Sequence, residues 1–309
     1  MIHHVFANRS NAGDWLSARG IQSLLAPWPV VEHWCDAPFV SETLATLARA
    51  TERDFIIIGG GGLFMDYFVP FWEGFLSITE RVPFVIWGVG YCDMKRERTI
   101  PPPKLIEEIV SRARLCVVRD DLTHRHLARC QLPPPVPCPA MVAVPTAAAV
   151  PEPRLLHVDH FDNVGKVIHE FMVKTGEMFA EKTGRSYRQT NNLLPGGHFK
   201  ALGRIVELYT SADLVLTSRL HGCIMALATG RRVLAVSADH KVESFMAAAG
   251  LSEWVMDLDS SGSLMERLHR LPEQKPPCSF VERARAQNRS VAARVRELIT
   301  AHPSGGTQQ

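Results

Sequence analysis

Apolar residues in the first half of the chain gather in short runs separated by amphipathic segments. The runs are rich in β-branched residues and do not alternate with polar ones, which is typical of strands buried on both faces of a parallel sheet. Apolar positions between the runs recur with helical spacing. We therefore expect strands at His3–Ala7, Asp54–Ile58, Pro83–Gly88 and Leu115–Val118, and helices at Ser41–Ala50, Leu63–Thr79, Lys104–Arg112 and Leu122–Cys130.

The second half repeats this alternation after a stretch rich in proline and alanine. Proline at this density blocks helices and central strands, so we expect a linker within Gln131–Pro153, with one short strand at Met141–Val144. The expected later strands are Arg154–Val158, Asp213–Thr217 and Arg232–Ser237. The expected later helices are Asn163–Lys182, Gly203–Thr210, Cys223–Ala228, Val242–Ala249 and Glu282–Thr300.

Strands that alternate with helices predict an α/β fold with doubly wound sheets. The chain has 309 residues, which is long for one hydrophobic core and suits two domains. We expect two Rossmann-like domains that face a central cleft. Their predicted bounds are 1–135 and 154–281, with a linker at 136–153, a terminal helix at 282–300 and a disordered tail at 301–309.

Composition and charge argue against several classes of protein. The formal net charge is +2 and no long block of Lys and Arg occurs, so nucleic acid is not an expected partner. No apolar run approaches the ~18 residues of a membrane helix, and the first residues lack the pattern of a signal peptide. We expect a cytoplasmic protein without a transmembrane segment, for which peripheral contact with the inner face of a membrane stays open.

Metal binding and disulfides are also not expected. The seven cysteines form no C-x-x-C pair, so neither a disulfide framework nor a zinc site is indicated. The cluster of His157, Asp159 and His160 is the one candidate metal site, but a single short cluster without remote partners is weak support. We therefore predict no metal ligands and no metal requirement.

Ligands of open α/β sheets bind beyond the carboxyl ends of the strands, and two motifs of the first half occupy such places. Asp14 follows the first strand, where it either caps the next helix or acts as the general base on a sugar hydroxyl. The four glycines of Gly59–Gly62 follow a strong strand. Gly60 and Gly61 either let a ligand approach the backbone or form a tight turn into a helix.

Two further places carry basic residues. Arg119 ends the Leu115–Val118 strand, where its guanidinium either binds a carboxylate or phosphate, or pairs with a neighbouring Asp at the surface. The most specific motif is Thr217-Ser218-Arg219-Leu220-His221-Gly222, in which Ser218 is the expected N-cap. Arg219 and His221 then lie at a helix start, where the helix dipole and free amides favour an anion. Lys241 follows the next strand and can reach the same crevice.

Taken in this order, these motifs resemble the polysaccharide pyruvyl transferase family. The matching segments are 11–14 (NAGD), 54–63 (DFIIIGGGGL), 83–90 (PFVIWGVG), 117–123 (VVRDDLT), 138–140 (CPA), 212–222 (ADLVLTSRLHG) and 237–245 (SADHKVESF). The resemblance implies a GT-B-like fold with the acceptor on the N-terminal domain and the donor on the C-terminal one. It implies phosphoenolpyruvate as the donor and co-substrate, with no other cofactor. The implied product is a pyruvate ketal on a hydroxyl pair of a hexose, usually in a lipid-linked or polymeric surface glycan.

The resemblance also implies roles for individual residues. Arg119, Arg219, Leu220 and His221 match the family's donor-binding positions, and Lys241 matches a basic position near them. On this basis the cations, assisted by the helix amides after Ser218, would bind the phosphate and carboxylate. We expect His221 to protonate the methylene carbon or to hydrogen-bond the departing phosphate, with Asp14 as the base.

Two other functions stay open. A GT-B glycosyltransferase would use a nucleotide sugar, although no acidic ribose clamp is evident in the second half. A non-catalytic glycan-binding relative would not need the complete cationic set.

The segment 184–200 matches no family motif, which leaves acceptor recognition unassigned. Tryptophan could supply a sugar platform, although such side chains more often lie in the core; the candidates are Trp15, Trp28, Trp34, Trp72, Trp87 and Trp254.

Overall fold

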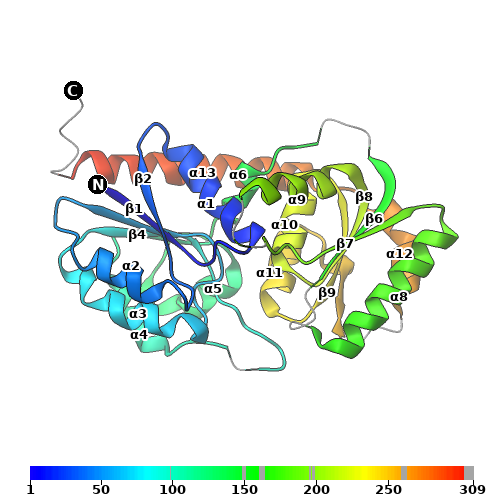
Figure 1. Cartoon of the computed structure of the whole chain (residues 1–309), viewed down its shortest axis with the longest axis horizontal. Helices are drawn as coiled ribbons and strands as arrows, with labels where there is room; N and C mark the ends of the chain where they lie inside the picture. The colour runs from blue at the N-terminus through cyan, green and yellow to red at the C-terminus, as the bar shows by residue number, and fades with distance from the viewer. Residues whose placement is uncertain are drawn as a thin grey trace.

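The computed structural model shows two α/β domains side by side, each built on a five-stranded parallel sheet (Figure 1). The strand order is β2-β1-β3-β4-β5 in the first sheet and β10-β9-β8-β6-β7 in the second. The structure describes residues 1–97, 99–147, 151–159, 164–194, 196, 199–258 and 263–302, with only the backbone at 199 and 200.

The elements of the first domain alternate along the chain. Its strands are β1 (Ile2–Phe6), β2 (Val30–Trp34), β3 (Phe55–Gly59), β4 (Phe84–Val89) and β5 (Leu115–Val118). Its helices are α1 (Ala12–Leu25), α2 (Val40–Leu47), α3 (Val69–Leu76), α4 (Pro103–Arg112) and α5 (Asp121–His126), with 3-10 turns at η1 (Asp66–Phe68), η2 (Ile78–Glu80) and η3 (Ala128–Cys130).

The second domain follows a short helix, α6 (Ala140–Ala143). Its strands are β6 (Glu152–Val158), β7 (Ser186–Thr190), β8 (Ala212–Thr217), β9 (Arg232–Ser237) and β10 (Val255–Asp257). Its helices are α8 (Lys166–Lys182), α9 (Phe199–Ser211), α10 (Leu220–Ala228), α11 (His240–Ala248), α12 (Leu264–Arg270) and α13 (Cys278–Thr300), with 3-10 turns at η5 (Ser252–Trp254) and η7 (Leu271–Glu273). None of the described helices is both long enough and apolar enough to cross a membrane.

Every strand expected outside the linker is present. The sequence did not indicate β2, β7 or β10, and all three are short strands at sheet edges. An edge strand such as β7 has polar, largely exposed residues, so it lacks the apolar run that marks a central strand. The helix expected over Leu63–Thr79 is divided into η1, α3 and η2. Pro70 lies in the first turn of α3, where a missing N–H costs least.

The strand expected at Met141–Val144 is wrong, because this segment forms α6. Its apolar residues are buried in a core shared by α1 and the second domain. Packing between α1 and the start of α6 is close: a Cβ at Gly20 would lie 2.0 Å from the carbonyl oxygen of Pro139. Tertiary packing against α1 thus fixes a segment whose local sequence indicated an extended chain.

The last helix, α13, crosses from the second domain to the first (red in Figure 1). Its start packs in the core of the second domain, and its end packs against the first sheet. Asn288 lies between, where it accepts a hydrogen bond from Trp87 Nε1 (3.1 Å) and donates one to the Pro137 carbonyl (2.8 Å). This helix therefore contributes to the cores of both domains.

Main-chain hydrogen bonds also join the domains at two places. Ala12 N donates to Asn192 O (2.9 Å), and Leu194 N donates to Ser10 O (2.7 Å). Elsewhere Lys95 N donates to Ala238 O at 3.1 Å. These contacts bring the carboxyl ends of both sheets together, which is where a ligand site is expected.

Candidate functional site

A cavity of about 320 Å³ lies between the two domains, at the carboxyl ends of their strands. This volume is at the lower end of the range for small-molecule sites. Of the nine residues expected at the site, the cavity is lined by Asp14, Arg119, Ser218, Arg219, Leu220, His221 and Lys241. Segments that are distant in sequence, from both domains, thus converge on one small space.

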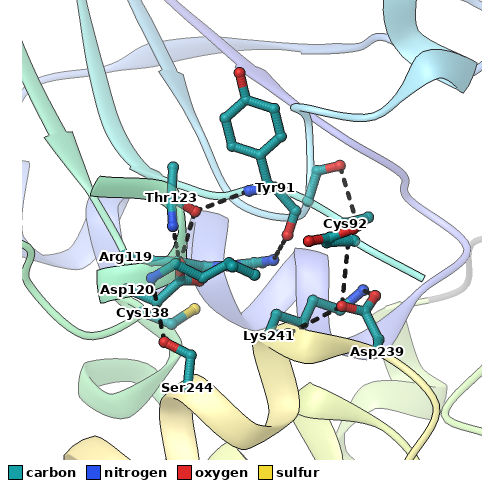
Figure 2. Close-up of polar contacts among 12 residues, drawn as sticks. Tyr91, Cys92, Arg119, Asp120, Thr123, Cys138, Asp239, Lys241 and Ser244 are labelled. Atoms are coloured by element: carbon teal, nitrogen blue, oxygen red, sulfur yellow. Dashed lines mark hydrogen bonds and ion pairs between the residues drawn. The ribbon is translucent and has the colours of Figure 1, made fainter. Parts of the chain in front are cut away.

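Arg119 extends from the end of β5 and is almost fully buried. Its Nε donates to Asp120 Oδ2 (3.1 Å) and its Nη2 donates to the Tyr91 carbonyl (3.3 Å; Figure 2). Asp120 also caps α5, since its Oδ1 accepts from Thr123 N at 2.8 Å. A Cβ at Gly90 would lie 2.3 Å from Arg119 Nε, so this glycine makes room for the guanidinium. Arg119 thus pairs with the neighbouring Asp120, as one alternative expected, but it is buried rather than at the surface and it lines the cavity.

Lys241 is held in the same way by a second cap aspartate. Asp239 is the N-cap of α11, and its Oδ1 accepts from Lys241 N (3.0 Å) and from Asp93 N (3.2 Å). The other oxygen of Asp239 pairs with Lys241 Nζ (Figure 2). Sequence reasoning missed Asp239, although an Asp just before a helical pattern is a recognisable cap signal. Each cap aspartate thus fixes both a helix start and a cation.

The expected cap at Ser218 is wrong. The N-cap of α10 is Arg219, whose N–H donates to Thr217 Oγ1 (3.0 Å), while the Ser218 hydroxyl donates to Asp159. Asp159 also accepts a hydrogen bond from His169 Nδ1 at 2.8 Å. Ser218 therefore points toward the end of the neighbouring strand β6, which is a tertiary contact that local sequence does not encode.

Asp14 and His221 face each other across the domain boundary. Asp14 Oδ1 lies 3.9 Å from His221 Nδ1, and His221 Nε2 lies 3.8 Å from Cys138 Sγ. Asp14 does not cap α1; that role belongs to Asn11, whose Oδ1 accepts from Gly13 N at 2.9 Å. Nδ1 is thus the ring nitrogen that faces the carboxyl, while Nε2 faces the thiol of Cys138.

Burial and the nearby cations change the acidity of both groups. Burial lowers the pKa of His221 well below its usual value, and the charges of Arg119, Arg219 and Lys241 lower it further. Burial raises the pKa of Asp14 to about 7, although the same three cations act in the opposite direction. With no anion bound, these pKa shifts favour a protonated Asp14 below about pH 7 and the neutral form of His221.

The glycine loop after β3 supports Asp14 and contributes one residue to the cavity wall. Gly60 and Gly61 have φ values of +101° and +105°, which favour glycine. A Cβ at Gly61 would lie 2.7 Å from Asp14 Oδ1. Neither residue lines the cavity, whereas Gly62 does. No helix begins directly after the loop, so the expected tight turn into a helix is wrong; the next element is η1, which starts at Asp66.

A second set of cavity-lining residues was not foreseen. It is uncharged and comes from the first domain; we call it the neutral wall and define it as Asn8, Asn11, Met65, Tyr67 and Phe68. Apart from the motif that contains Asn11, no sequence signal marked these residues. None of the candidate tryptophans lines the cavity.

Metal-ligating side chains do not gather anywhere in the described part of the chain, where no group of three or more His, Cys, Asp or Glu is placed to hold an ion. In the candidate cluster, His157 Nδ1 shares a hydrogen bond with the Tyr187 hydroxyl at 2.7 Å. His160, its third member, lies outside the described residues.

Solved structures with the same architecture share little sequence with this chain. A protein of Listeria monocytogenes assigned as a UDP-N-acetylglucosamine 2-epimerase has a TM-score of 0.61 at 12% identity, with 99% of this chain and 97% of that one covered. The UDP-GlcNAc 2-epimerase of Neisseria meningitidis has a TM-score of 0.58 at 10% identity, with 94% and 99% covered. A functionally uncharacterised protein of Klebsiella pneumoniae has a TM-score of 0.51 at 15% identity, with 82% and 89% covered. The fold is therefore GT-B-like, as the sequence predicted.

Comparison with curated proteins gives no match. Residues 11–240, however, match the family described as polysaccharide pyruvyl transferase. This match includes every residue that we expected at the site except Lys241, which follows it directly. It covers most of the chain, and the chain therefore belongs to the polysaccharide pyruvyl transferase family.

Proposed function

We propose that this protein transfers the pyruvyl group of phosphoenolpyruvate to a hydroxyl pair of a sugar and releases phosphate. The observation that supports this most is the convergence of three cations on one small cavity. Arg119, Arg219 and Lys241 come from the ends of β5, β8 and β9 and lie with His221 and Asp14. Phosphoenolpyruvate carries a phosphate and a carboxylate, and a cavity with three fixed cations suits two adjacent anionic groups.

The cations are positioned before the donor arrives. Asp120 and Asp239 hold Arg119 and Lys241, and Arg219 donates from Nη1 to the Asn191 carbonyl at 2.9 Å. Donors that are already oriented need little rearrangement when an anion binds, and buried charges act strongly because water does not screen them. Leu220 and the first amides of α10 complete this side of the site.

Donor binding would also change the acidity of both groups. Burial is the main cause of the low pKa of His221, and the donor's negative charge offsets only the part that is due to the three cations, which raises the pKa of His221 and that of Asp14 together. Transfer of the Asp14 proton to Nδ1 of His221 is the step that would set the acid and the base. The 3.9 Å separation of these atoms is longer than a hydrogen bond, and catalytic contacts often tighten when substrate binds. His221 then becomes the acid and Asp14 the base, which are the roles expected from the sequence.

The reaction balances with these two groups. His221 gives a proton to the methylene carbon, which becomes a methyl group and leaves the adjoining carbon electrophilic. One sugar hydroxyl bonds to that carbon as its proton passes to Asp14. The bond from this carbon to the phosphate oxygen breaks, and the second hydroxyl closes the ketal. The two sugar hydroxyls release two protons. One replaces the proton that His221 gave to the methylene carbon, and the other leaves with the phosphate.

We place the protein in the cytoplasm, with phosphoenolpyruvate as co-substrate and no other cofactor. The acceptor is a sugar of a surface glycan or of its lipid-linked precursor, which would bring the protein to the inner face of the membrane.

Thermal unfolding with phosphoenolpyruvate or uridine diphosphate in metal-free buffer tests the donor. A ligand at about 100 times its Kd stabilises the folded protein by about 2.7 kcal/mol. We expect this with phosphoenolpyruvate, its loss in Arg219→Ala, and its retention in Arg204→Ala, an exposed arginine of α9 outside the cavity. Stabilisation by the nucleotide alone would instead support a glycosyltransferase.

Once an acceptor is known, the rate of a His221→Ala variant tests the proposed acid. A variant that keeps more than about a tenth of the wild-type rate would exclude His221 as the acid, since only ~1.4 kcal/mol of barrier is then lost.

A further inference from the structure

The residues that line the cavity include two chemically different sets. The cationic set consists of Arg119, Arg219 and Lys241, which follow β5, β8 and β9. The neutral wall (Asn8, Asn11, Met65, Tyr67 and Phe68) carries two amides, one phenol and two apolar side chains. A small anion needs only the first set. The second set suits an uncharged ligand that has both hydroxyl groups and an apolar face.

The amides of the neutral wall have unused donors. Asn8 Oδ1 accepts from Ser10 N (2.6 Å), and Asn11 Oδ1 accepts from Gly13 N (2.9 Å). These bonds fix the orientation of both side chains. Neither Nδ2 atom has a hydrogen-bond partner among the described residues. Both residues therefore line the cavity with side chains of fixed orientation, and their Nδ2 donors form no hydrogen bond within the described part of the chain.

Tyr67 supplies an oriented aromatic ring. Its hydroxyl accepts a hydrogen bond from Ala37 N (3.0 Å), and its ring lies perpendicular to Phe68 with centroids 4.9 Å apart. The side chain is nevertheless exposed to 50%, unlike most large aromatic residues of this chain. An exposed ring that is held at both ends is suited to stack on the apolar face of a ligand, and it costs little entropy to do so.

We propose that the neutral wall is the acceptor subsite and takes the terminal hexopyranoside of the glycan. The apolar face of the sugar stacks on Tyr67, and its hydroxyl oxygens accept hydrogen bonds from Nδ2 of Asn8 and Asn11. Asn11 is the cap of α1, whose Asp14 faces His221, so this placement directs a hydroxyl pair toward the proposed base. The inference rests on the proposed function, because it assigns the second substrate of the same reaction.

The exposure of Tyr67 also agrees with an acceptor longer than one sugar. A cavity of about 320 Å³ that also holds the donor has room for little beyond one ring. The remainder of a glycan can leave past Tyr67 into solvent.

Saturation-transfer NMR with the methyl β-glycosides of galactose, glucose and mannose tests the subsite, with and without phosphoenolpyruvate. We expect at least one glycoside to bind, with Kd raised about tenfold in Tyr67→Ala, which corresponds to the ~1.4 kcal/mol that an aromatic contact can supply. Asn8→Ala should weaken binding similarly. Phe171→Ala is the matched control, since it removes a partly exposed ring of α8 that does not line the cavity.

Two results would overturn the subsite: no glycoside binds the wild-type protein, or Tyr67→Ala and Asn8→Ala bind it as the wild type does. Thermal unfolding checks that each variant folds. Because Tyr67 and Asn8 are substituted separately, the subsite can still be tested if one of the two variants does not fold. Binding of phosphoenolpyruvate is measured separately in the same samples. If glycosides bind and depend on Tyr67 while phosphoenolpyruvate does not bind, the subsite stands and the proposed donor is wrong.

Discussion

A single methyl group at Gly13 should displace the histidine of the site. A Cβ built at Gly13 lies 2.1 Å from both Cγ and Nδ1 of His221, and 2.5 Å from its Cβ. Ordinary contact begins at 3.4 Å, so in Gly13→Ala the ring and α1 must separate by about 1.3 Å. His221 cannot retreat freely, because its far side is packed against Cys138 and its backbone lies in the first turn of α10.

The consequence for activity is large, because a catalytic group misplaced by about 1 Å can cost about 100-fold in rate. We therefore expect kcat of Gly13→Ala to fall by about 100-fold, or about 2.7 kcal/mol of barrier. Overpacking should lower the free energy of unfolding by only about 1–3 kcal/mol. The assay is phosphate release from phosphoenolpyruvate with an accepted glycoside, together with urea unfolding.

Gly203→Ala is the matched control. Gly203 is an exposed glycine of α9, and a Cβ there meets nothing within 4 Å. Gly203→Ala should raise the free energy of unfolding by about 0.5–1 kcal/mol and leave kcat unaltered. If Gly13→Ala kept kcat within about threefold of wild type, the close approach of α1 to His221 would not be needed for catalysis, and the reasoning would be refuted.

Two further predictions concern charge. The pKa of Asp14 is raised by burial from 3.8 to about 7, so the folded chain binds more protons than the unfolded chain in this window. Wild-type stability is then lost as pH rises from about 4 to 7, and Asp14→Asn should be more stable than wild type by up to about 4 kcal/mol at pH 8 but not at pH 3. Urea unfolding at several pH values measures the difference in unfolding free energy between Asp14→Asn and wild type, and a difference that does not change with pH would contradict the prediction. Lys95 pairs with Glu243 and Asp257 across the domain boundary. Lys95→Ala should lower the unfolding free energy by about 1 kcal/mol at low salt and by less near 1 M salt, whereas an equal loss at both would exclude an ionic origin.

The sequence predicted the central elements because their signal is local. A strand buried on both faces is almost entirely apolar, so β3, β4 and β8 were visible as runs. β5 lies at a sheet edge but is buried along its whole length, so it was visible as well. The edge strands β2, β7 and β10 have exposed or polar positions, and they were missed.

The site was predictable where strand ends carry unusual residues. Arg219, His221 and Lys241 follow neighbouring strands of the second sheet, whose carboxyl ends share one edge, and Arg119 follows a strand of the first sheet whose carboxyl edge faces the same cavity. The neutral wall was not predicted, because Tyr67 reaches the cavity from a short 3-10 turn whose sequence has no distinguishing pattern.

By itself, then, the sequence determined the α/β class, the central strands and the cationic set of the site. Only the tertiary structure decided which side chain caps each helix, how α6 and α13 join the domains, and which group holds the proton. Ser218, for example, does not cap α10 because its hydroxyl bonds to Asp159, which follows the neighbouring strand β6. The proton depends on burial and on cations contributed by both domains, so Asp14 has a pKa of about 7 that no local sequence encodes.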